Sequence, residues 1–69
     1  MTLAERVVEF LNSRRPSAFC DDCIADEMGS NRHHTQQTTH PLGLTRGYER
    51  ARNHCHRCGA DNKLAIRGL

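Results

Sequence analysis

The chain has 69 residues, 36% of them hydrophobic and 26% charged, and its formal net charge is +2. A chain of this length forms a single domain, residues 1–69, whose apolar core barely offsets the entropy of ordering it, so we expect a metal ion or another cross-link. The sequence has no run long enough to span a membrane and no secretory leader, which excludes a membrane partner and favours the cytoplasm.

A first helix is predicted for residues 3–12. Thr2 and Glu5 form a capping box, in which each side chain accepts from the backbone amide of the other residue. Apolar residues then recur at helical spacing, at Leu3, Val7, Phe10 and Leu11. We expect the helix to end before Pro16, because the residue that precedes a proline is driven away from helical angles.

Two further helices are predicted, for residues 21–28 and 31–40. Gly29 is expected to end the first of them, because glycine readily adopts the left-handed conformation of many helix ends. The second helix has almost no apolar residue, and the side chains spaced to face a core are Thr35, Thr38 and Leu42. Pro41 is expected to kink or end this helix.

A β-hairpin is predicted for residues 48–67. Residues 48–54 have an extended pattern, and residues 63–67 form a short mixed run. In this run Leu64 and Ile66 lie on one side, as expected of a half-buried returning strand. The predicted fold class is α+β, with three short helices followed by a β-hairpin whose tip is a cysteine motif.

The cysteines form two CxxC pairs, which are Cys20/Cys23 and Cys55/Cys58. Two thiolates separated by two residues bind one metal ion from a single turn, and two such pairs complete the tetrahedral shell of a structural zinc. Gly59 follows the second pair, which is typical of a zinc knuckle whose glycine takes a positive φ. The first pair is expected in the first turn of helix 21–28, where backbone amides favour anionic sulfurs. One zinc ion would then link this helix to the hairpin.

Other interpretations of the cysteines remain open. A disulfide framework suits a short chain with an even number of cysteines, but no leader directs this chain to an oxidising compartment. A redox CxxC needs a buried strand and a βαβ unit, which neither pair has. Iron fits the same ligands, although the 31 residues between the pairs, with their helical pattern, favour zinc. His54 or His56 can replace a cysteine, which four thiols make unnecessary.

The charges are divided unevenly along the chain. Residues 1–29 contain three Arg and six acidic residues, whereas residues 30–69 contain seven basic residues, two acidic residues and all five His. This asymmetry favours an anionic partner on one face, with nucleic acid as the first candidate. The plainer alternative is an ordinary solvated surface.

The six residues Ile24–Gly29, with the sequence IADEMG, resemble the signature of winged helix-turn-helix domains. In that family a small alanine, here Ala25, lets two helices approach, and a glycine makes the turn. The order of helix, helix, turn, polar helix and hairpin is also similar to that family, and the cysteine knuckle resembles that of a zinc ribbon. The resemblance implies a small prokaryotic-type DNA-binding protein that regulates transcription, with residues 31–40 as recognition helix and 48–67 as wing.

The predicted contacts to double-stranded DNA are Arg32, His33, Gln36, Gln37, His40, Arg50, Arg52 and Arg57. Arginine reads guanine, glutamine reads adenine, and the arginines of a wing contact phosphates or enter a minor groove. The alternative is a zinc-stapled protein-interaction module, or self-association through the apolar side of the first helix. An enzyme acting on a small molecule is not expected, because four thiolates leave zinc no open position for water.

Overall fold

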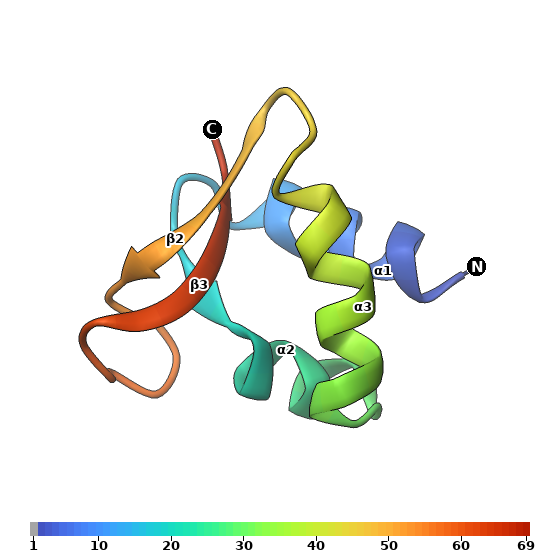
Figure 1. The fold of residues 1–69 in the computed structure, drawn as a ribbon, viewed down its shortest axis with the longest axis horizontal. Helices are drawn as coiled ribbons and strands as arrows, with labels where there is room; N and C mark the ends of the chain where they lie inside the picture. Colours follow the sequence, from blue (N-terminus) through green and yellow to red (C-terminus); the bar gives the residue numbers. More distant parts are fainter. Residues whose placement is uncertain (1) are drawn as a thin grey trace.

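The computed structural model describes residues 2–69, which form three helices and three strands (Figure 1). In chain order the elements are α1 (Leu3–Ser13), β1 (Phe19–Cys20), α2 (Asp21–Met28), α3 (Arg32–Leu42), β2 (Tyr48–Asn53) and β3 (Lys63–Gly68). The α+β class and the three predicted helices are confirmed, with ends that lie within two residues of those predicted. No helix in this part of the chain is long and apolar enough to cross a membrane.

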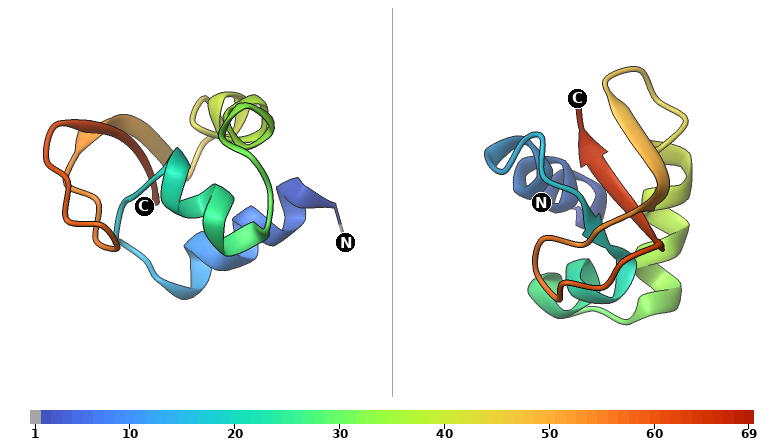
Figure 2. Two further views of the ribbon diagram at one scale, coloured as in Figure 1. Left: turned by 90° about the horizontal axis from the view of Figure 1, so that it is seen from below. Right: turned by 90° about the vertical axis from the view of Figure 1, so that its left-hand side faces the viewer.

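The three strands form one antiparallel sheet in the order β1-β3-β2. β2 and β3 make the predicted hairpin, with Arg50 opposite Ile66 and Ala51 opposite Ala65. The strand β1 was not predicted, because its two residues are too few to show an alternating pattern; it pairs Phe19 with Ile66. In Figures 1 and 2 the helices group on one side of the molecule and the hairpin extends from the other.

The apolar side of α1 lies in the core. The capping box is present, with the Glu5 amide donating to Thr2 Oγ1 (3.2 Å) and the Thr2 amide donating to Glu5 Oε1 (3.1 Å). The apolar side chains of α1 pack with one residue from each of β1, α2 and β3, in a cluster of Val7, Phe10, Leu11, Phe19, Ile24 and Ile66. The chain itself therefore covers the side of α1 that carries Val7, Phe10 and Leu11.

The contact between α2 and α3 depends on a tight turn. Gly29 ends α2 with φ 66°, the left-handed conformation predicted for it. The Ser30 amide donates to the Ala25 carbonyl (2.9 Å), which closes the last turn of α2. Ala25 is buried, and the two helices pack against each other across this turn.

The inner side of α3 differs in part from the prediction. Thr35 is fully buried and Leu42 packs against the core, as expected. Thr38 is only half-buried, and Thr39 takes the inner position instead, because it lies one turn after Thr35 on the same face. Pro41 lies inside the last turn, and the helix continues past it to Leu42. The Gly43 amide still donates to the Thr39 carbonyl (2.9 Å).

Burial along β3 follows the position of the helices. Ile66 is fully buried among the core residues, whereas Leu64 is 39% exposed. Leu64 pairs with Arg52 in the part of the hairpin that extends away from the helices (Figure 1). The prediction of a half-buried strand is therefore right for Ile66 and wrong for Leu64.

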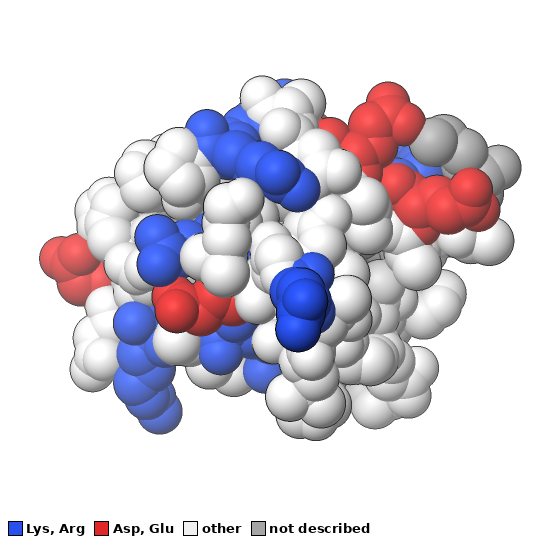
Figure 3. Space-filling view, turned by 90° about the horizontal axis from the view of Figure 1, so that it is seen from above, with Lys and Arg blue, Asp and Glu red and all other residues white. Residues whose placement is uncertain are grey.

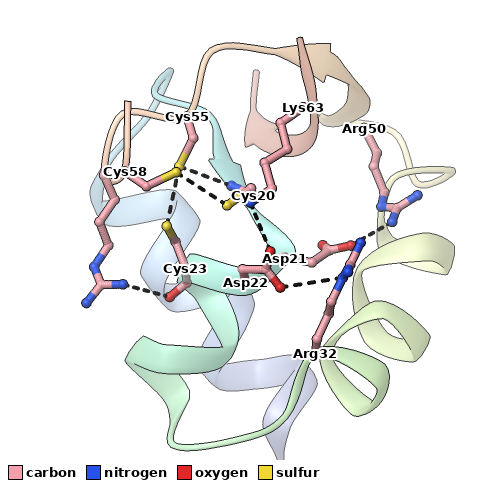
Figure 4. Close-up of polar contacts among 10 residues, drawn as sticks. Cys20, Asp21, Asp22, Cys23, Arg32, Arg50, Cys55, Cys58 and Lys63 are labelled. Atoms are coloured by element: carbon pink, nitrogen blue, oxygen red, sulfur yellow. Dashed lines mark hydrogen bonds and ion pairs between the residues drawn. The ribbon is translucent and has the colours of Figure 1, made fainter. Parts of the chain in front are cut away.

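A buried polar network holds α3 to the rest of the fold. Asp21 Oδ1 accepts from Thr39 Oγ1 (2.8 Å), and Asp21 Oδ2 accepts from Arg50 Nη2 (2.7 Å). The side chains of this ion pair are each 10% exposed, and they join α2 to β2 (Figure 4). Glycine is required at Gly43, because a Cβ there would collide with the Arg50 side chain. Arg50, which was predicted to contact nucleic acid, has its guanidinium turned inward to the buried Asp21 carboxylate.

Asp21→Ala is expected to lower the free energy of unfolding by about 3–5 kcal/mol, because it leaves the buried Arg50 charge without its partner. Urea denaturation followed by circular dichroism, at constant metal content, measures this change. Asp26→Ala is the matched control, since it removes the same charge from α2 at a side chain that is 70% exposed, and it should cost much less. Equal losses for the two variants would contradict a structural role for the buried pair.

Candidate metal centre

The four cysteines meet where the helices adjoin the hairpin. Cys20 ends β1 and caps α2, and Cys23 lies in the first turn of α2, as predicted. Cys55 and Cys58 lie in the segment between β2 and β3. All four Sγ atoms lie within 4.8 Å of one another (Figure 4). The cluster therefore joins the start of α2 to the hairpin.

The positions of the sulfurs fit a tetrahedral metal ion. Cys20 Sγ lies 3.9 Å from Cys58 Sγ, and Cys23 Sγ lies 3.6 Å from Cys55 Sγ. In a tetrahedral shell with metal–sulfur bonds of about 2.3 Å, neighbouring sulfurs are about 3.8 Å apart. A disulfide would need about 2.0 Å, and all four cysteines are free thiols. The four sulfurs can hold one metal ion, and a shell of four thiolates suits zinc.

The second pair has the backbone of a metal knuckle. Gly59 takes φ 76°, the positive value predicted for the glycine after the last ligand. The Gly59 amide donates to the Cys55 carbonyl (2.9 Å), and the Cys55 amide donates to the Ala60 carbonyl (2.9 Å). Cys55 is fully buried, whereas Cys58 is exposed. This tight loop presents both sulfurs to the cluster.

Hydrogen bonds dock the knuckle beside β1. The His56 amide donates to the Ala18 carbonyl (2.9 Å), and the Ala18 amide donates to His56 Nδ1 (3.3 Å). His54 Nδ1 lies 2.7 Å from a carboxylate oxygen of Asp61. Both imidazoles therefore have partners outside the cluster, and within residues 2–69 the cluster consists of cysteines alone.

Burial governs the proton affinity of two of the thiols. It raises the pKa of Cys20, and it raises the pKa of Cys23 to about 12. The amides at the start of α2 were predicted to favour anionic sulfurs, but at Cys20 burial outweighs them. At Cys55 burial also acts to raise the pKa, yet backbone amides, that of Cys58 foremost, bring the pKa down to about 6. One sulfur is therefore close to a thiolate already, and two must lose protons to bind a metal.

Ion pairs connect the acidic first part of the chain to the basic second part. The pairs are Asp21 with Arg50, Asp22 with Arg32 and Lys63, and Arg57 with Asp26 and Glu27. Part of the opposite charge on the two parts of the chain is therefore neutralised by ion pairs within the fold. On the face shown in Figure 3, acidic side chains gather at one end of the molecule, and Lys and Arg side chains lie over the rest of the face together with smaller acidic patches.

The predicted contacts to nucleic acid are placed differently on α3 and on the hairpin. The five predicted residues of α3 are exposed, and four of them line one shallow depression, namely His33, Gln36, Gln37 and His40. The fifth, Arg32, has an ion pair with Asp22. On the hairpin, Arg57 pairs with Asp26 (2.6 Å) and Arg50 is buried. Of the three predicted hairpin arginines, Arg52 alone has no acidic partner within residues 2–69.

Asp21 and Lys63 were missed by the sequence analysis. Asp21 lies beside Cys20 and anchors the buried network, and Lys63 reaches Asp22 from a distant strand. The available signal was the Asp-Asp pair inside the first CxxC, since carboxylates next to thiolates need cations to offset the repulsion. No local pattern indicates which cations supply this charge.

One Co²⁺ or Zn²⁺ ion per chain is expected to bind, and visible absorption of the Co²⁺ form reports a tetrahedral sulfur shell. Cys58→Ser should weaken binding strongly because it removes one of four ligands. His54→Ala is the matched control in the knuckle, and it should retain the full stoichiometry because its ring lies outside the cluster. Unchanged metal affinity in Cys58→Ser would contradict a four-thiol site.

Metal binding is expected to release protons and to weaken as the pH falls. Burial raises the pKa of Cys20 and Cys23, so both are protonated thiols at neutral pH without metal, and only thiolates bind the ion. Lower pH thus favours the metal-free chain and higher pH favours the complex. Calorimetry in buffers of different ionisation enthalpy counts the protons, and at least one from each of these thiols is expected. Binding without proton release would show that the thiols are already ionised.

No protein-family model matches the chain, and comparisons with curated proteins and with solved structures found no match either. A functional assignment must therefore rest on the residues of this chain. The relevant features are the four-thiol cluster, the polar outer face of α3 and the ion pairs between the two parts of the chain.

Proposed function

We propose that this chain is a zinc-stabilised, winged-helix-like domain that binds double-stranded DNA through α3 and acts in transcription regulation. The features of the Ile24–Gly29 signature support the winged-helix assignment. Ala25 is buried where α2 and α3 pack, and Gly29 has the left-handed conformation that makes the turn. The hairpin of β2 and β3 follows α3, in the place of a wing.

The observation that carries the proposal is the outer face of α3. This face has no acidic side chain, and its depression is lined by His33, Gln36, Gln37 and His40. An α-helix fits the major groove of DNA, and a glutamine amide both donates and accepts, as the edge of adenine requires. The large apolar or aromatic anchor typical of a protein-docking helix is missing from this face. Base edges therefore suit it better than an apolar partner does.

Zinc has a structural role in this proposal. Four thiolates complete its tetrahedral shell, and they would fix the knuckle to the start of α2. The apolar core cluster is small, with six buried residues, so the free energy of metal binding would contribute directly to folding. The ion would thereby set the position of the hairpin relative to the helices.

The second candidate function is a protein-interaction module. Of the seven basic residues after residue 29, five have an acidic partner, and zinc with four thiolates adds a net negative charge. The resulting positive field is weak, which favours modest and salt-sensitive binding of nucleic acid. Two exposed apolar side chains, Leu44 (81% exposed) and Leu69 (58% exposed), could instead contact a protein.

Titration of the zinc-loaded protein with a short DNA duplex at low salt, followed by amide chemical shifts, tests the proposal. We expect the largest shifts in residues 32–40 and smaller ones in β2. Gln36→Ala combined with Gln37→Ala should weaken binding about tenfold or more, because each good bidentate base contact is worth about 1–3 kcal/mol. The fold should persist, since both side chains are exposed.

Arg6→Ala is the control for this experiment. It removes a full positive charge from an exposed position on α1, and it should weaken binding less than the neutral double substitution on α3. A larger effect of Arg6→Ala would indicate attraction by net charge alone. If no amide shifts occur at any site, the protein-interaction module becomes the preferred function.

A further inference from the structure

Asp22 lies between two cations at the surface. Its Oδ1 is 3.4 Å from Arg32 Nε on α3, and its Oδ2 is 2.9 Å from Lys63 Nζ on β3 (Figure 4). The exposed fractions of the side chains are 71% for Arg32, 37% for Lys63 and 43% for Asp22, so solvent reaches all three. One carboxylate thus faces two positive charges.

Each of the three side chains belongs to a regular element of the fold. Asp22 is in the first turn of α2, Arg32 begins α3, and Lys63 begins β3 and pairs with Asn53 in the hairpin. The two cations are therefore positioned before any ligand arrives.

The group lies between the two surfaces that the proposed function uses. Arg32 opens α3 and directly precedes His33, which lines the depression on the outer face. Lys63 begins β3 and pairs with Asn53 at the end of β2, so it belongs to the hairpin. A DNA backbone that crosses from α3 to the hairpin would pass this group. A guanidinium and an ammonium that converge on one carboxylate could also bind one phosphate in its place.

We propose that Arg32 and Lys63 form a binding site for a phosphate of the DNA backbone, and that Asp22 occupies this site in the free protein and limits its affinity. The inference rests on the proposed function of α3. A phosphate that reaches the two cations must replace the carboxylate as their partner, and the two anions then repel each other. Asp22 therefore orients the cations and competes with the ligand.

Fluorescence anisotropy of a labelled DNA duplex, measured at several salt concentrations, tests the site. Asp22→Asn should raise the affinity severalfold, because the cations lose their internal competitor. Lys63→Gln should lower the affinity and reduce the slope of log K against log salt by about 0.9, the value for one phosphate contact. Lys63→Arg keeps the charge and should retain most of the binding. Amide spectra of each variant establish that it is folded.

Asp26→Asn is the matched control. It removes the same charge from the same helix, but it frees Arg57 and not the proposed pair. An equal gain in Asp26→Asn, or no gain in Asp22→Asn, would overturn the site and indicate an effect of net charge. If DNA shifts the α3 amides but Asp22→Asn and Lys63→Gln do not change the affinity as expected, the phosphate site is wrong and the proposed function of α3 stands. Absence of binding by the unaltered protein would overturn both.

Discussion

The sulfur cluster joins two parts of the chain that share little apolar contact. Five of the six residues in the core cluster come from α1, β1 and α2, and Ile66 is its sole member from the hairpin. Three of the cysteines form a separate buried cluster beside the start of α2. A metal ion would convert this cluster into a cross-link between α2 and the loop of the hairpin. This cross-link would add to the pairing of β1 with β3, the burial of Ile66 and the Asp21–Arg50 ion pair, which also hold the hairpin.

The distribution of charge has a structural explanation. Asp21, Asp22 and Asp26 all lie on α2, and each has a basic partner from α3 or the hairpin. Acidic side chains at the start of a helix also interact favourably with its dipole. The acidic first part of the sequence thus attracts the basic second part. This reduces the positive charge that remains for an external anion. The position of each unpaired cation therefore indicates where an anion could bind better than the net charge does.

Features with a local cause were predictable from the sequence. The Thr2 capping box, the Gly29 helix end, the positive φ of Gly59 and the meeting of the two CxxC pairs were all predicted. Features that depend on distant partners were not. The inward turn of Arg50 requires Asp21, and β1 exists only because β3 offers it an edge. The nucleic-acid contacts remain predictions, since exposure alone does not assign them.

The attachment of α3 has a consequence for how its outer face can vary. The helix is held by Thr35, by Thr39 with its bond to Asp21, and by the turn at Gly29, and none of these groups belongs to the exposed depression. The side chains that hold α3 to the fold and the side chains that it exposes are thus separate sets on one helix. Substitutions at positions such as Gln36 and Gln37 can accumulate without loss of stability. The scaffold could therefore present many different surfaces, and related chains could diverge in target while their cysteines and threonines stay fixed.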